Sequence, residues 1–324
     1  MKIALIGGVS STLTTLRALY RHGFSFVDVY GYEPVNPDIV SGYKNLKNDA
    51  QCFGYSYRGF RKINDHAPEI KTGDYDVIMV VGLSQLVSDE IILNAKIGCV
   101  GFHPTKLPRG RGRAPVAWLI LSENEGSATF FQIKPDQDAD AGPILVQSIF
   151  SVDRANDTAA SIEEKILNHI NIALDDWLPK LALGEWTPKE QDHSLSSEYG
   201  IRKLEDGFIN WLNNVDQIKR HIRSAISPHP GAFAFIGSHA FKIQFSSKND
   251  ITNISGVEGR VLKKEGNNYL IQAGDGCVWI ETDMELKIGT QLGVIRPYEI
   301  FLLNEKIVQL EEKINQLTSQ IENQ

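Results

Sequence analysis

Residues 99–118 read CVGFHPTKLPRGRGRAPVAW, and the interpretation of the whole chain starts from this stretch. The short apolar run at 97–100 predicts a buried strand that brings His103 to the edge of a sheet. The loop after His103 is dense in residues that restrict or extend backbone freedom, namely Pro104, Pro108, Gly110 and Gly112. We therefore expect a loop of fixed shape with an imidazole at its start.

A run of carboxylates follows the next expected strand. Residues 128–134 predict a strand, and residues 136–142 then read DQDADAG. A histidine and a carboxylate at the ends of neighbouring strands are typical of an acid/base pair. Asp136, Asp138 and Asp140 all compete for the carboxylate role on this evidence alone.

The beginning of the chain predicts the fold class. Residues 2–8 and 24–32 predict strands on either side of a helix at 12–22, and 76–82 is a continuous apolar strand. This β-α-β pattern favours an α/β protein with a Rossmann-like parallel sheet. Residues 7–12 read GGVSST rather than G-x-G-x-x-G, so the sequence disfavours a dinucleotide site even though Glu33 follows the second strand.

Composition narrows the function classes. A length of 324 residues is typical of about two domains, and the net charge of −7, with a pI near 5.7, disfavours a nucleic-acid partner. Three cysteines lie far apart and outside any metal-ligand spacing, which indicates idle thiols in a reducing compartment. We find neither a signal peptide nor a membrane-spanning run, and we expect a cytoplasmic protein.

The second half predicts a smaller β domain. A long amphipathic helix at 157–183 precedes a polar linker at 184–197 and a short helix at 217–226. Short alternating strands separated by turns then predict an OB-like antiparallel β domain, with strands at 232–236, 241–245, 256–264, 269–273 and 277–281. The expected division is a Rossmann-like domain, a connecting segment, the OB-like domain and a C-terminal coiled-coil helix, at 1–190, 191–231, 232–297 and 298–324.

The tail carries an unbroken heptad pattern. Isoleucine occupies one core position and leucine the other, at Ile300, Leu303, Ile307, Leu310, Ile314, Leu317 and Ile321. This combination favours a parallel two-stranded coiled coil, in which Lys306 of one chain faces Glu311 of the other. We expect a homodimer through 300–321; a single amphipathic helix docked on its own domain is the alternative.

These motifs resemble the formyltransferases that use 10-formyltetrahydrofolate, a group that includes methionyl-tRNA formyltransferase and the sugar N-formyltransferases. The resemblance covers about residues 1 to 300. It rests on a His-x-x-x-Leu-Pro-x-x-Arg-Gly pattern followed by Asp-x-Gly, at His103, Leu107, Pro108, Arg111, Gly112, Pro115, Asp140 and Gly142, and on the stretches 1–8, 82–85, 205–211 and 230–233. Because Asp140 alone is followed by x-Gly, we select His103 and Asp140 as the catalytic pair.

The resemblance also implies binding residues. Backbone groups of 82–86 would hold the pterin ring, although a plain strand-to-helix turn would look the same in sequence. The implied donor-binding residues are Gly82, Leu83, Ser84, Gln85, Leu86, Arg113, Ala114, Pro115 and Asp138. The implied acceptor-binding residues are Gly8, Ser10, Thr105 and Arg111. Arg109 is either an anion contact or part of a solvated loop, and the aromatic residues between 43 and 60 either shape the acceptor pocket or pack against the sheet.

The implied reaction is direct attack of an amine on the formyl carbon, without a metal or a covalent enzyme intermediate. His103 would polarise the formyl oxygen, and Asp140 would orient His103 and accept the amine proton. The family usually has Asn two residues before this histidine, but this chain has Gly101. Three outcomes stay open on the sequence alone: slow turnover, use of a backbone N–H or Thr105 instead of the asparagine, or no activity.

Three hypotheses follow for the biochemical role. We expect an N-formyltransferase that acts on an amino sugar, in nucleotide-linked form. Methionyl-tRNA formyltransferase is the second hypothesis, which the acidic composition disfavours. A folate- or sugar-nucleotide-binding protein without turnover is the third.

Overall fold

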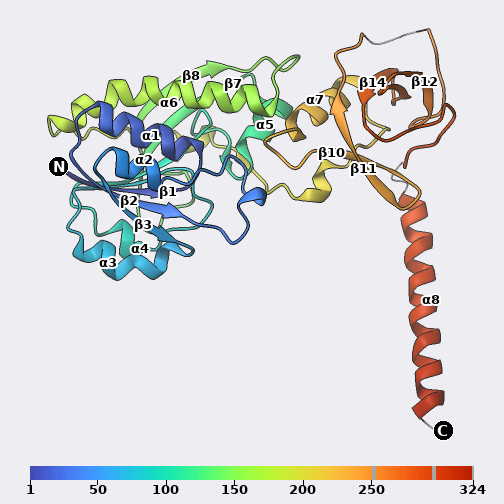
Figure 1. The fold of residues 1–324 in the computed structure, drawn as a ribbon, viewed down its shortest axis with the longest axis horizontal. Coiled ribbons are helices and arrows are strands. Elements are labelled where there is room, and N and C mark those ends of the chain that lie inside the picture. Colours follow the sequence, from blue (N-terminus) through green and yellow to red (C-terminus); the bar gives the residue numbers. More distant parts are fainter. Residues whose placement is uncertain (250–252, 294–296, 323–324) are drawn as a thin grey trace. The chain divides into compact units, whose positions relative to one another are not determined.

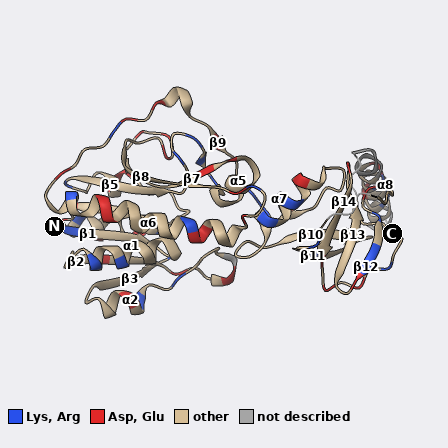
Figure 2. Ribbon diagram, turned by 90° about the horizontal axis from the view of Figure 1, so that it is seen from above, with Lys and Arg blue, Asp and Glu red and all other residues tan. Residues whose placement is uncertain are grey.

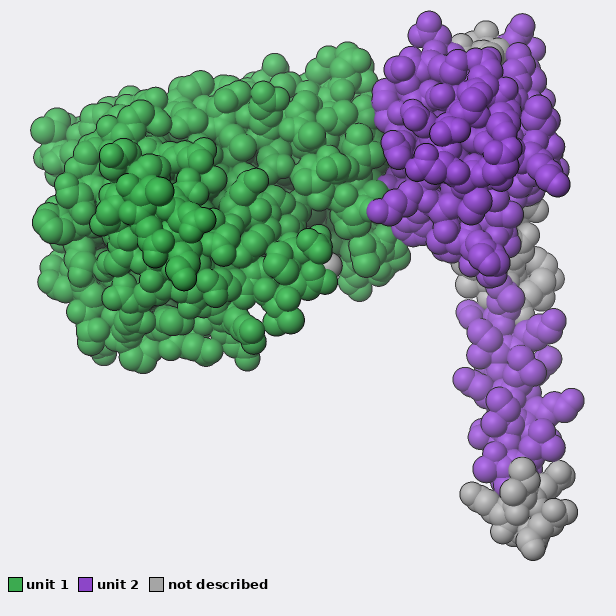
Figure 3. Space-filling model, in the orientation of Figure 1, with its two compact units in different colours: residues 1–207, 220–231 green, residues 208–219, 232–324 purple. Residues whose placement is uncertain are grey.

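The computed structural model describes residues 1–249, 253–293 and 297–322. The chain divides into two compact units, coloured separately in Figure 3. Unit 1 consists of Met1–Gly207 and Arg220–Gly231, and unit 2 consists of Phe208–Lys219 and Ala232–Gln324. The four-segment division expected from the sequence stays a prediction.

Unit 1 is built on a seven-stranded sheet in the order β3-β2-β1-β4-β5-β7-β8. Its strands are β1 (Lys2–Gly7), β2 (Phe26–Tyr32), β3 (Ser56–Phe60), β4 (Val77–Val80), β5 (Gly98–His103), β7 (Glu125–Ile133) and β8 (Ile144–Ser151). The first five strands are parallel, which confirms the Rossmann-like sheet. The last two strands extend this sheet in the antiparallel sense, because β7 runs antiparallel to β5 and β8 antiparallel to β7.

Helices cover both faces of this sheet (Figure 1). On one face lie α1 (Ser10–Arg21) and α6 (Ala159–Ala182), and on the other lie α3 (Ala67–Thr72) and α4 (Asp89–Ile92). The apolar residues of α6 recur every three or four positions and are buried in one core cluster with β1 and β7. This burial confirms the long amphipathic helix.

The polar region between β2 and β4 holds more regular structure than its sequence indicates. It forms α2 (Lys47–Cys52), β3 and α3, with short 3-10 turns η1 (Pro37–Ile39) and η2 (Ile63–His66). The aromatic residues of this region pack: the rings of Phe53 and Tyr20 stack 4.4 Å apart, and Tyr55 and Phe60 are buried. Packing against the sheet is therefore the interpretation that the structure favours.

The expected linker at 184–197 is not a free connection. It contains the 3-10 turn η3 (His193–Leu195) and leads into β9 (Glu198–Tyr199), which pairs with β6 (Arg111–Gly112) in the loop after His103. The turn η4 (Leu204–Gly207) follows, and α5 (Pro115–Ser122) begins just after β6. Residues far apart in sequence thus meet at the loop that the first motif defines.

Unit 2 is the expected small antiparallel β domain. After α7 (Val215–Ala225), which contributes to both units, five strands pair in the order β10-β11-β14-β13-β12. These are β10 (Ala232–Ile236), β11 (His239–Phe245), β12 (Val261–Glu265), β13 (Asn268–Gln272) and β14 (Cys277–Glu281). The strand expected at 256–264 begins only at Val261, because 256–260 form a turn.

The tail forms one helix, α8 (Pro297–Glu322). Five heptad-core side chains are each more than half exposed, namely Leu303, Ile307, Leu310, Ile314 and Leu317. The side chains of Ile300 and Ile321, and the last two residues of the expected coiled coil, lie outside the described residues. Within the described ranges, we find no helix whose length and apolar character would let it cross a membrane.

Candidate functional site

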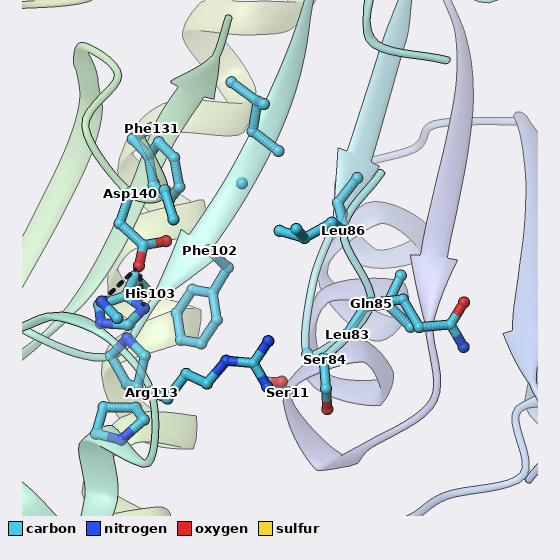
Figure 4. A pocket seen from close by; sticks show the side chains of 18 of the residues that line it. Ser11, Leu83, Ser84, Gln85, Leu86, Phe102, His103, Arg113, Phe131 and Asp140 are labelled. Atoms are coloured by element: carbon cyan, nitrogen blue, oxygen red, sulfur yellow. Dashed lines mark hydrogen bonds and ion pairs between the residues drawn. The ribbon is translucent and has the colours of Figure 1, made fainter. Parts of the chain in front are cut away.

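The structure brings His103 and Asp140 together at one edge of the sheet. His103 is the last residue of β5, and β7 is the strand that pairs with β5. Asp140 lies in the loop that joins β7 to its hairpin partner β8. The His103 Nδ1 atom lies 3.4 Å from Asp140 Oδ2, and both side chains are largely shielded from solvent. Figure 4 shows the pair on one wall of a cavity, so a reactant in that cavity can reach an imidazole and a carboxylate at once.

The hydrogen bonds of His103 define its protonation. The Nε2 atom lies 2.8 Å from the carbonyl oxygen of Gly110, and a carbonyl oxygen only accepts, so Nε2 carries a proton. The Nδ1 atom then meets a carboxylate oxygen, which is favourable when Nδ1 is also protonated. The arrangement therefore places Nδ1 where a proton can pass between His103 and the Asp140 carboxylate in the cavity wall.

Asp140 is held in an unusual backbone conformation. Its φ is +59°, in the left-handed region that Asp tolerates better than most residues. The backbone N–H of Gly112 donates to Asp140 Oδ2 over 3.0 Å, and Figure 4 shows the other oxygen directed into the cavity. A Cβ at Gly142 would lie 1.7 Å from the carbonyl oxygen of Gln132, so only glycine fits two residues after Asp140. This packing is the physical basis of the Asp-x-Gly pattern.

The cavity has a volume of about 950 Å³, enough for two small reactants. Every residue implied as catalytic or donor-binding lines it: His103, Asp140, Gly82, Leu83, Ser84, Gln85, Leu86, Arg113, Ala114, Pro115 and Asp138. Four residues implied as acceptor-binding are not part of its wall: Gly8, Ser10, Thr105 and Arg111. The individual binding roles stay predictions.

The wall at Gly82–Leu86 carries side chains that point in different directions (Figure 4). The side chain of Gln85 is used internally, because its Oε1 accepts from Ile63 N and its Nε2 donates to the carbonyl of Arg61. Leu86 is 76% exposed and makes an apolar rim.

The four residues outside the wall have other surroundings. Gly8 and Ser10 flank Val9 at the start of α1, where Val9 and Ser11 do line the cavity. Thr105 lies on a second cavity of about 390 Å³, as does Arg109, and the Thr105 hydroxyl is buried without a hydrogen-bond partner. Arg111 is buried among polar side chains behind the loop.

Gly101 has no space for the asparagine of the family pattern. A Cβ there would lie 2.6 Å from Cζ of Phe131, the residue paired with Gly101 on β7, and 3.0 Å from Cγ1 of Ile133. An apolar ring thus occupies the place at Gly101 where the side chain of the expected asparagine would begin, and Figure 4 shows this ring beside Asp140. Thr105 does not line this cavity, and its hydroxyl is buried, so it does not compensate for the loss.

Sequence reasoning missed several wall residues. Phe131 lies on the strand beside β5, and its pairing with Gly101 becomes visible only once the register is known. Glu163 of α6, and Pro228 with His229 after α7, come from segments without a recognisable motif. Arg113, which the sequence did single out, extends across the cavity towards Ser11 (Figure 4).

Two further groups behave as expected of packing residues. His169 donates or accepts at Nδ1 with Ser148 Oγ over 2.8 Å, and burial lowers the pKa of its imidazole. Burial raises the pKa of the Cys99 thiol to about 12, and all three cysteines are free. Neither His169 nor Cys99 lines the cavity.

Known proteins share the fold of this chain. A sugar 3N-formyl transferase, WlaRD, solved with dTDP and 5-N-formyl-THF, has a TM-score of 0.61 at 18% identity over 88% of this chain and 99% of that chain. An N-formyltransferase from Helicobacter canadensis, solved with folinic acid and dTDP-3-aminofucose, has a TM-score of 0.63 at 17% identity over 87% and 99%. HypX from Aquifex aeolicus has a TM-score of 0.60 at 17% identity, and the match covers 86% of this chain but only 43% of HypX.

Sequence comparison carries the assignment further. A methionyl-tRNA formyltransferase from Citrifermentans bemidjiense is 29% identical over 292 residues, which are 86% of this chain and 87% of that protein. The family model "Formyl transferase" matches residues 47–176, and the model "Formyl transferase, C-terminal domain" matches residues 202–294. The two matches together cover more than half of the chain, in the order in which the two domains occur in the family. This chain belongs to the formyl transferase family.

Proposed function

We propose that this protein transfers a formyl group from 10-formyltetrahydrofolate to the amine of a nucleotide-linked amino sugar. The observation that carries the proposal is the His103–Asp140 pair in the wall of a cavity large enough for a folate and an amine. The structures of WlaRD and of the Helicobacter canadensis enzyme, solved with folates and dTDP or a dTDP-amino sugar, support this choice of reactants.

Each residue of the pair has one task in this reaction. The donor, when bound, supplies the formyl carbon, which forms a bond to the acceptor nitrogen and loses its bond to N10 of the folate. The free oxygen of Asp140 accepts the proton that the acceptor amine loses. The Nδ1–H of His103 stabilises the negative charge on the formyl oxygen and then protonates the leaving nitrogen. The proton taken by Asp140 returns to His103 and completes the cycle.

We assign the binding roles by position on the wall. Backbone groups of Gly82–Leu86 face the pterin ring, and Ala114, Pro115 and Asp138 contribute to the same donor site. Arg113 reaches across the cavity towards the start of α1 and pairs there with an anionic group. Gly8 and Ser10 stand behind the wall, because the Gly8 carbonyl accepts from Lys44 N and the Ser10 N–H donates to the Gly42 carbonyl, so we assign them no direct contact with the acceptor.

Charge favours a sugar acceptor over a tRNA. The chain carries a net charge of −7, and Figure 2 shows acidic and basic residues mixed along α6 rather than a basic band. A tRNA acceptor requires positive surface that neutralises phosphates. Methionyl-tRNA formyltransferase remains the second candidate because the Citrifermentans bemidjiense relative carries that name.

Binding without turnover is the third candidate. With Gly101 packed against the Phe131 ring, the site lacks the amide donor of the family's asparagine, and the loss of a single oxyanion donor costs about 10² to 10³ in rate. His103 is then the main donor to the oxyanion. This candidate predicts tight folate binding without product.

One experiment separates the three candidates. The purified chain is incubated with 10-formyltetrahydrofolate and, separately, with dTDP- and UDP-linked amino sugars and methionyl-tRNA, and each acceptor is examined by mass spectrometry. We expect the mass gain of one formyl group on a nucleotide sugar. Product on methionyl-tRNA alone, or folate binding without any product, would refute the proposal.

We also propose that α8 joins two copies of this chain in a parallel coiled coil. Its core residues from Leu303 to Leu317 are more than half exposed, and the alternation of Ile and Leu favours two parallel strands. In that register Lys306 faces Glu311 of the second copy, whereas antiparallel helices would place lysine near lysine.

Light scattering tests this dimer. A chain that ends at Pro297 should be a monomer if α8 is the interface, and an unchanged dimer would refute the proposal. Lys306→Glu should weaken a parallel dimer because it faces Glu311, and the double exchange Lys306→Glu with Glu311→Lys should restore it. Tighter association of Lys306→Glu alone would indicate antiparallel helices instead.

A further inference from the structure

A buried glutamine behind the cavity links the two loops that carry the catalytic pair. Gln191 is 6% exposed, and it lies between the ranges matched by the two family models. Its Nε2 donates to the carbonyl oxygens of Asp140, over 2.8 Å, and Gly142, over 2.6 Å. Its Oε1 accepts from Arg111 Nη2 over 2.8 Å. Each polar atom of this side chain amide is therefore used by one of the two loops.

The contact with Asp140 acts on a strained residue. Asp140 has φ +59°, a conformation that persists only where the surroundings hold it. The donation from Gln191 restrains the Asp140 carbonyl, and the Gly112 N–H restrains its carboxylate over 3.0 Å. Together they fix the direction in which the carboxylate points towards His103.

The contact with Arg111 acts on the other loop. Arg111 lies between Gly110, whose carbonyl accepts from His103, and Gly112, whose N–H donates to Asp140. Its guanidinium is buried and faces Gln191 and His193 behind the cavity. The side chain amide of Gln191 thus connects the loop that orients His103 with the turn that carries Asp140.

We propose that Gln191 is a positioning residue that holds Asp140 and His103 in reactive register by bridging the Asp140–Gly142 turn to Arg111. Gln191 does not line the cavity and does not touch a reactant. It acts by fixing the distance between His103 and Asp140, whose side chains do line the cavity. The expected effect on kcat rests on the proposed function. The expected effect on the positions of Asp140 and His103 does not depend on the acceptor.

Two substitutions of Gln191 test the role of its side chain amide. Gln191→Glu keeps an oxygen that faces Arg111 and removes both donors to the carbonyls, whereas Gln191→Met keeps the length and removes every polar contact. We expect each to lower kcat about 100-fold, the loss typical of a misplacement of about 1 Å, with KM for the donor and acceptor near the wild-type values. His193→Ala is the matched control, because it removes the other acceptor of Arg111 without touching the Asp140 turn, and it should keep wild-type kcat.

Hydrogen exchange at the Gly112 amide provides a readout without turnover. This N–H is bonded to the Asp140 carboxylate, so its exchange should accelerate in Gln191→Glu and Gln191→Met but not in His193→Ala. If the wild-type chain formylates none of the acceptors, the proposed function fails and this exchange rate alone decides on Gln191. A folded Gln191→Met with wild-type kcat, or with unchanged Gly112 exchange, would overturn the proposal even if Gln191→Glu does not fold.

Discussion

The two walls of the cavity are built on opposite principles. At Gly82–Leu86 the side chain of Gln85 is bonded inward, and the proposed function has the backbone face the donor. At the end of β5 and after β7, two side chains, His103 and Asp140, lie in the cavity wall and contact each other. A backbone wall tolerates substitution because every residue type offers the same groups. A side-chain wall depends on single atoms, so the effects of mutation should differ sharply between the two.

The largest effect is expected at His103. His103→Ala removes the Nδ1–H donor and the proton source for the leaving nitrogen, and we expect kcat to fall by about 10³-fold or more. Steady-state kinetics with the best acceptor measures it, and donor binding followed by fluorescence serves as the control for an intact site. Full turnover by this variant would refute the mechanism.

The second largest loss of kcat is expected at Asp140. Asp140→Asn keeps an oxygen that can accept from Gly112 but cannot take a proton from the amine, so we expect kcat to fall by about 10² to 10³ with little change in donor affinity. An equal loss in donor affinity would show that this wall binds the donor rather than acting on it. The comparison between the walls would then need revision.

Gly101 tests the packing behind the side-chain wall. Gly101→Asn places a Cβ against the Phe131 ring, and overpacking of this kind costs about 1–3 kcal/mol of stability. Thermal unfolding should show a lower Tm for this variant. The double variant with Phe131→Ala should recover part of the loss, and an unchanged Tm in the single variant would contradict the contact.

The smallest effect is expected on the backbone wall. Leu86→Ala removes an exposed side chain without touching the backbone, so we expect KM for the donor to change no more than about threefold, as for other surface substitutions worth within about 0.5 kcal/mol. Kinetics at varied donor concentration provides the measurement. A loss as large as that of Asp140→Asn would show that both walls act through side chains.

The wall that carries His103 and Asp140 could be predicted in outline from the sequence, but the residues that hold this pair in place could not. His103 and Asp140 follow recognisable strands and stand in a specific motif, and the structure places them 3.4 Å apart. Gln191 lies in a polar run that reads as a linker, because a glutamine that bonds to backbone carbonyls leaves no pattern in its own neighbourhood. Thr105 and Arg111 are in the motif but face away from the cavity, since loop direction depends on the contacts of the folded chain.

The sheet shows the same division. Buried strands such as β1 and β4 were predicted because continuous apolar runs are rare outside parallel sheets. The strand β8 and the antiparallel direction of β7 were not, because apolar alternation is the same in either direction and pairing partners are chosen across the sheet.

The sequence alone determined which residues are candidates for the chemistry, where the buried strands and long helices lie, and that the tail has an apolar stripe. These features depend on residue type and short-range spacing, and both can be read directly from the sequence. Only the tertiary structure decided that Phe131 fills the place beside Gly101, that Asp140 meets His103, and that Gln191 joins the two loops. Each of those contacts joins residues from different segments, and the distances between these residues are set only when the chain has folded.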